Sequence, residues 1–354
     1  MKNIVVNKKE LKDMLLSLFN NGVIRILFLI LLVIIAASVY SVQSRSDKKN
    51  FFGKIIYRES LIEAEPLPIN TKASFSFQKG ELPAVINIYS LEEQSEEQLM
   101  NLFNSISNKL LGKIAPKVIS DQTSKTYYKE VGRSVFVGNL LNGSFSFSGE
   151  SKTLLAGNSE NEIGNRVFTF LKENGLERNL SNSPAVTNLT RIGDELETTS
   201  SSSATILSFT FRPTIEEVPL VGIGEAGSLV SLLIDKTSGK IVKIQYYNPK
   251  TNTNNFGKYE LLGVNEVKKT PFSSFRVIQI IPDENGASDL DINDLARVNF
   301  TTLEIAYLVY PQKQNLLPPV YVLGGEAISS SGKRGKISVY LPAVKNSNLL
   351  NPAP

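Results

Sequence analysis

The chain has 354 residues, a formal net charge of +4, and neither cysteine nor histidine. Without cysteine there is no disulfide framework and no thiolate site, and without histidine the usual general base and the commonest zinc ligand are missing. The small positive charge is spread without blocks, which argues against a nucleic-acid groove and against an acidic tail.

Residues 1–22 predict a short basic amphipathic segment on the cytoplasmic side. Apolar side chains such as Leu11, Leu15 and Leu18 recur on one helical face, and lysines lie on the other face. A helix of this kind usually lies in the headgroup layer of a bilayer. Docking to another membrane protein is the alternative.

Residues 23–42 predict a single transmembrane helix. About twenty residues with a rise of ~1.5 Å each match the roughly 30 Å hydrocarbon core. The side chains expected to hold the anchor in the bilayer are Ile26, Leu29, Leu32 and Ile35. A cleaved signal peptide is the alternative reading, because small residues at 36–38 resemble a peptidase site. Lysine and arginine flank the segment almost equally, so charge alone does not give its orientation.

After the anchor, residues 43–70 predict a charged stalk, and residues 71–180 predict a first α+β domain. Ser95 and Ser159 are placed to cap two helices, the second of which ends at Asn174-Gly175. Apolar and polar residues alternate between and around these helices, as in half-buried strands. Because no βαβ rhythm is present, the sheet is expected to be antiparallel.

Residues 184–344 predict a second α+β domain, followed by a tail at 345–354. Its one catalogue motif is a G-x-G-x-x-G at residues 222–227. A dinucleotide site needs a helix directly after these glycines, whereas residues 228–235 alternate like a strand. We therefore predict the turn of a hairpin here, with no cofactor.

One cluster of oxygen-bearing side chains is a weak candidate for calcium binding. It comprises Asp283, Asn285, Asp289 and Asp291. The glycine and glutamate that an EF-hand loop requires are out of register, and a helix cap near Asn293 explains the same residues equally well.

Catalytic motifs are missing from the sequence. It lacks G-x-S-x-G and H-E-x-x-H. Paired glutamates such as Glu96 and Glu97 lie where a helix begins, and there their negative charges interact favourably with the helix dipole. We predict that the chain is not an enzyme and has no small-molecule substrate. A site assembled from residues distant in sequence stays open at this point.

The stretch from Val218 to Val242 resembles the strand, Gly-turn, strand pattern of PepSY-type domains. Residues 302–308 and 317–325 are similar to the closing strands of YycH/YycI-type regulators. The resemblance implies a single-pass protein whose PepSY-like extracytoplasmic domains modulate a membrane sensor kinase.

These observations predict an α+β fold in which a single N-terminal transmembrane helix precedes two antiparallel-sheet domains with a few packed helices. The predicted function is a membrane-anchored, extracytoplasmic protein-binding module that regulates or scaffolds a membrane partner such as a sensor kinase. Its expected partners are the bilayer and another membrane or envelope protein. The alternatives are a structural or adhesive envelope protein and an inhibitor or chaperone of an exported peptidase.

Overall fold

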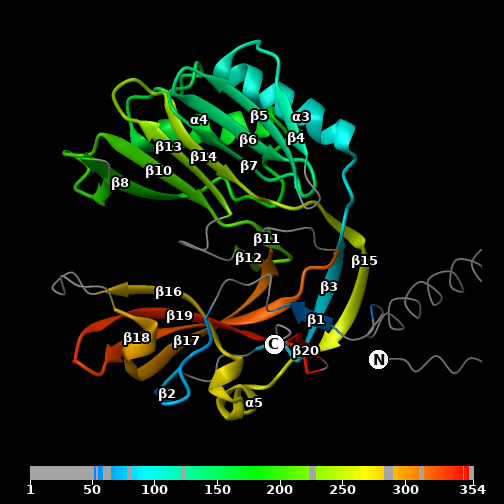
Figure 1. The fold of residues 1–354 in the computed structure, drawn as a ribbon, viewed down its shortest axis with the longest axis vertical. Coiled ribbons are helices and arrows are strands. Elements are labelled where there is room, and N and C mark those ends of the chain that lie inside the picture. The colour runs from blue at the N-terminus through cyan, green and yellow to red at the C-terminus, as the bar shows by residue number, and fades with distance from the viewer. Residues whose placement is uncertain are drawn as a thin grey trace, which may run out of the picture. The chain divides into compact units, whose positions relative to one another are not determined.

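The computed structural model describes residues 52, 55–58, 65–77, 82–120, 124–193, 195–222, 229–282, 290–310, 315–345 and 347–350. All of these residues belong to one compact unit, Phe52–Pro354. Two large sheets dominate this unit (Figure 1).

The first large sheet has nine strands, and every neighbouring pair in it is antiparallel. Two helices, α3 (Glu96–Leu111) and α4 (Glu160–Glu173), accompany it. In spatial order the strands are β4 (Lys117–Ser120), β5 (Lys125–Val131), β6 (Ser134–Asn139), β7 (Phe145–Ser148), β14 (Ile241–Tyr246), β13 (Val230–Asp235), β10 (Ile206–Phe211), β8 (Ala185–Ile192) and β9 (Glu195–Thr198).

The strand order shows that this sheet is built from two similar halves. The first half is helix α3 followed by β4, β5, β6 and β7, and the second is helix α4 followed by β8, β10, β13 and β14. The last strands of the two halves, β7 and β14, pair in the middle, while the first strands lie toward the outside. The halves are thus related by an approximate two-fold axis between β7 and β14.

The two helices repeat the same local design. Ser95 caps α3 by accepting a hydrogen bond from the Gln98 amide, and Ser159 caps α4 by accepting one from the Glu162 amide. The buried positions also coincide, since the following pairs lie equally far from the two capping serines: Leu99/Ile163, Phe103/Val167, Ile106/Phe170 and Ser107/Leu171. This spacing gives each helix one apolar stripe for the sheet.

Both helices cover the same face of the nine-stranded sheet. Phe103 of α3 contacts Phe136, and Gly164 of α4 lies against Phe209. Strand register connects these two contacts through one row of buried side chains, because directly opposed residues share a face. The row is Phe136, Phe147, Ile244, Leu232 and Phe209.

The second large sheet has seven strands and is mixed in direction. Its centre is β17 (Leu295–Val309), which pairs antiparallel with β18 (Pro319–Ser329) and parallel with both β2 (Lys72–Phe75) and β12 (Val218–Gly222). The remaining strands are β11 (Thr214–Ile215) beside β12, and β19 (Arg334–Pro342) and β16 (Arg276–Pro282) beyond β18.

The seven-stranded sheet draws its strands from both ends of the unit, and the nine-stranded sheet is inserted between them. The chain passes between the sheets along a ribbon of β3 (Val85–Leu91) and β15 (Thr251–Glu260), which pair antiparallel. It also leaves β10 to add β11 and β12 to the second sheet before it returns as β13. The other elements are α5 (Val264–Lys269), the short 3-10 helices Phe272–Ser274 and Ile292–Asp294, and the parallel pair of β1 (Ile55–Arg58) and β20 (Ser347–Leu350).

The predicted fold class is wrong. The unit is mostly β-sheet, the seven-stranded sheet contains parallel pairs, and strands from both sides of residues 181–184 share one sheet. The physical reason is that alternation gives each strand an inward and an outward face but does not select its neighbour. Residues in the expected stalk and tail also join the body, since Tyr57 and Leu67 are buried and β20 lies within 345–354.

The predicted single-pass, signal-anchored membrane architecture is also corrected. No helix in the described ranges is long and apolar enough to cross a membrane. The predicted span at 23–42, with Ile26, Leu29, Leu32 and Ile35, lies outside the described residues.

Candidate functional site

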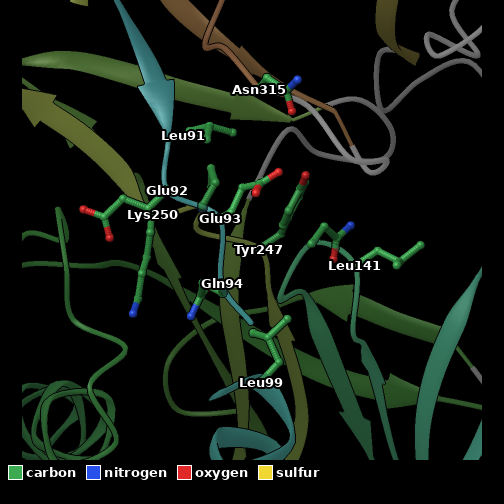
Figure 2. Close-up of a pocket in the computed structure, with 11 residues that line it drawn as sticks. Leu91, Glu92, Glu93, Gln94, Leu99, Leu141, Tyr247, Lys250 and Asn315 are labelled. Carbon is green, nitrogen blue, oxygen red and sulfur yellow. The ribbon is translucent and has the colours of Figure 1, made fainter. Parts of the chain in front are cut away.

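One pocket lies where the chain passes between the two large sheets (Figure 2). Its walls come from the end of β3 and the start of α3, from the connection between β14 and β15, and from the turn between β6 and β7. The lining residues are Leu91, Glu92, Glu93, Gln94, Leu99, Leu141, Asn142, Tyr247, Pro249, Lys250 and Asn315.

Backbone hydrogen bonds hold the two crossing segments together at this pocket. The Glu92 amide donates to the Lys250 carbonyl at 2.8 Å, and the Leu91 amide donates to the Asn315 carbonyl at 2.9 Å. The Tyr247 hydroxyl donates to the Tyr310 carbonyl, and burial raises the pKa of Tyr247. In Figure 2, Glu93 and Tyr247 project to the same side of the view, whereas Glu92 points the other way.

The size of the pocket argues against a substrate site. Its cavity of about 120 Å³ holds on the order of four waters at ~30 Å³ each, well below the roughly 300 Å³ or more of most ligand pockets. Glu92 is further engaged at 3.7 Å by the Arg178 guanidinium. We interpret the pocket as the packed junction of the two sheets.

The calcium candidate gains no geometric support. Asp283, Asn285 and Asp289 lie outside the described residues. Asp291 caps a short 3-10 helix, and its Oδ1 accepts a hydrogen bond from the Asn293 amide at 2.9 Å. Among the residues that the structure covers, no three acidic side chains gather as a metal site would require.

The first described element after the glycine motif is a strand. Gly222 ends β12, residues 223–228 lie outside the described ranges, and the next element, β13, is a strand. The prediction that a strand follows the glycines is confirmed. The predicted hairpin is wrong, because β12 and β13 belong to different sheets. Lys333 and Arg334 lie at the turn between β18 and β19 and are exposed.

The side of the nine-stranded sheet away from the helices is here called the open face. One row of directly opposed side chains crosses it and is half-buried or exposed along its whole length. Between β5 and β10 the row carries hydroxyl, amide and small apolar groups, and at the β4 edge it ends in Lys117. Its members from β5 to β10 are Tyr128, Val137, Ser146, Gln245, Ser231 and Thr210. Sequence reasoning missed this surface, although the Phe-Ser-Phe-Ser alternation of β7 is its signal.

A polar cluster is buried between α3 and β5. Lys129 is 1% exposed, and its Nζ donates to the Asn108 Oδ1 at 2.5 Å and to the Ser107 Oγ at 3.5 Å. The Tyr127 hydroxyl lies 2.8 Å from the same Ser107 oxygen and donates to Asn104. Burial lowers the pKa of Lys129 and raises that of Tyr127. Its polar atoms are hydrogen-bonded to one another, so we regard the cluster as structural.

Comparison with known proteins adds little about function. No family model matches the chain, and no curated protein matches it. Among solved structures, it is similar to an uncharacterised protein from Eubacterium rectale ATCC 33656, with 12% identity and a TM-score of 0.47. That match covers 83% of this chain and 97% of the other.

Proposed function

We propose that this chain is a protein-binding module that regulates or scaffolds a partner protein. The observation that supports this most directly is the open face, because a nine-stranded sheet with helices on one side offers its other side to a partner. Its row of hydroxyl, amide and small apolar side chains has few charges to desolvate, as in the centres of protein interfaces.

A sensor kinase as the partner and an extracytoplasmic location rest on the resemblance and the composition alone. Both stay predictions, as do the alternatives of an envelope protein and a peptidase inhibitor or chaperone. These readings differ in what should contact the open face: one stoichiometric protein, a wall polymer, or an exported peptidase.

Site-specific photo-crosslinking in cells of the source organism tests the proposal. A crosslinker at Gln245 lies on the open face, and a matched control at the exposed Thr169 lies on the outer side of α4. We expect one protein to be crosslinked from Gln245 and not from Thr169. Equal labelling from both positions, or recovery of wall polymer without protein, would contradict the proposal.

A further inference from the structure

The two edges of the nine-stranded sheet differ in chemistry. The edge strand β9 carries Glu195 and Glu197, and such charges protect an edge from unwanted pairing. The edge strand β4 instead presents Val118 and Ile119, whose exposed fractions are 43% and 58%. Ile114, just before β4, is 46% exposed. An apolar edge strand of this kind is suited to pairing with another strand.

The second half of the sheet shows what such a pairing looks like. Strand β8 occupies the position in the second half that β4 occupies in the first. Beyond β8 lies β9, which pairs antiparallel with it from Leu189↔Thr198 to Ile192↔Glu195. Beyond β4 the described residues provide no strand. The first half therefore lacks the strand that completes the second.

Charge indicates which kind of strand would fit. In the second half, the strand Glu-Leu-Glu-Thr carries its two glutamates on one face and Leu196, opposite Arg191 of β8, on the other face. The edge at β4 has exposed basic side chains, Lys113 and Lys117, beside its apolar residues. The neighbouring Lys125 already pairs with Glu96, whereas Lys113 and Lys117 are exposed on the described part of this edge.

We infer that the outer edge of β4 binds an extended segment of a partner protein in which acidic and apolar residues alternate. This segment adds antiparallel to β4 as a tenth strand. The inference rests on the proposed protein-binding function and specifies where and how an extended partner segment is held. Backbone hydrogen bonds supply the pairing, while Lys117 faces the acidic side of the segment and Val118, on the other face of β4, faces its apolar side.

Peptide binding to the isotope-labelled full chain tests the inference. One probe is a synthetic peptide that repeats the Glu-Leu-Glu-Thr sequence of β9, and its control repeats Lys-Leu-Lys-Thr. We expect the acidic peptide to bind and to shift the amide resonances of residues 117–120. Charge reversal by Lys117→Glu should weaken it about tenfold, since two unfavourable surface charge contacts replace favourable ones.

A matched variant controls for general effects on the sheet. Leu196→Asp alters the opposite edge strand, β9, and should leave the affinity unchanged, whereas Ile119→Asp should abolish binding. Unchanged affinity in Lys117→Glu and Ile119→Asp, resonance shifts confined to β8, or equal binding of both peptides would overturn the inference. So would concentration-dependent dimerisation that Ile119→Asp abolishes, because the occupant is then a second copy of the chain.

These outcomes are independent of the crosslinking test. If Gln245 captures one protein while the β4 variants bind the peptide normally, the protein-binding function stands and the edge inference fails. If Gln245 captures no protein, the proposed function fails whatever the peptide does.

Discussion

At the scale of single residues, the buried Lys129 is the side chain whose effect on stability is easiest to predict. Its ammonium group reaches an amide oxygen and a hydroxyl, and it is held away from water. A buried charged donor that loses its acceptor keeps the full cost of desolvation. Asn108 is therefore the residue that makes this lysine tolerable in the core.

We expect Asn108→Ala to lower the free energy of unfolding by about 1.5–3 kcal/mol, the usual range for a hydrogen bond to a charged group. Urea denaturation provides the measurement, and Asn101→Ala, on the exposed side of the same helix, is the control. Combining Asn108→Ala with Lys129→Met should recover most of the loss. An additive double variant would show that the two side chains are not coupled.

A second residue-scale feature is the turn between β11 and β12. Glu216 and Glu217 both have positive φ, 48° and 70°, a region that L-residues enter at a cost of about 1 kcal/mol each. Glu216 also accepts a hydrogen bond from the Asn87 Nδ2 at 3.2 Å, so it has a second role.

We expect Glu217→Gly to raise the free energy of unfolding by about 0.5–1 kcal/mol, because glycine adopts this conformation without strain. Glu217→Ala keeps the strain and serves as the control in thermal or urea unfolding. Equal effects of the two substitutions would mean that side-chain loss, and not backbone conformation, controls stability at this turn.

At the scale of elements, close contacts set how each helix lies on the sheet. A Cβ at Gly138 of β6 would come within 2.6 Å of the Phe103 ring, and that ring is fully buried. The second half uses the opposite arrangement, with glycine on the helix at Gly164 and phenylalanine on the strand at Phe209. Each half thus pairs one glycine with one aromatic ring where helix and sheet meet.

We expect Gly138→Ala to destabilise the protein by about 1–3 kcal/mol, the range for overpacking a close-packed core. Phe103→Leu should be more harmful alone than in combination with Gly138→Ala, because the smaller side chain makes room for the added methyl group. Denaturant unfolding of the four proteins in this cycle measures the coupling. If the two substitutions had additive effects, the contact between residues 138 and 103 would not be the source of the destabilisation.

The elements were more predictable than their arrangement. The spacing of Leu99, Phe103 and Ile106 after Ser95 predicts α3, and the structure confirms it, including the reciprocal bond from the Ser95 amide to Gln98. The neighbours of β12 were not predictable, because a short, mostly apolar strand fits either large sheet equally well. The open face was missed for a related reason. Small hydroxyl residues on a strand are typical of any solvent-facing position, and only the strand register shows that those of several strands form one row.

At the scale of the whole molecule, buried tyrosines dominate the expected response to pH. Burial raises the pKa of several tyrosines, that of Tyr321 to about 12. A group whose folded pKa is raised keeps its full contribution to stability below its unfolded pKa and loses it as the pH rises toward the folded value. The sequence contains no histidine that would titrate between pH 5 and 8. The other strongly affected tyrosines are Tyr57, Tyr89, Tyr246, Tyr247, Tyr307, Tyr310 and Tyr340.

We expect stability to be nearly flat around neutral pH and to fall steeply above about pH 10, by roughly 1.4 kcal/mol per pH unit for each such tyrosine. Chemical denaturation across this range, followed together with tyrosinate absorbance, gives the number of linked protons. Tyr57→Phe should reduce the slope by about one proton, whereas the partly exposed Tyr128→Phe should change it much less. A gradual loss of stability that begins near pH 7 would contradict this account.

Because the nine-stranded sheet is inserted in the sequence between strands of the seven-stranded sheet, the two sheets can form at different times during synthesis. All strands of the nine-stranded sheet lie between Lys117 and Tyr246, so a ribosome has supplied every one of them well before the chain is finished. The seven-stranded sheet must wait for β19, which ends at Pro342, before β2 and β12 can take their places in a complete layer. Because long loops close more slowly than short ones, we expect the nine-stranded sheet to form first during synthesis and the seven-stranded sheet to assemble onto it last.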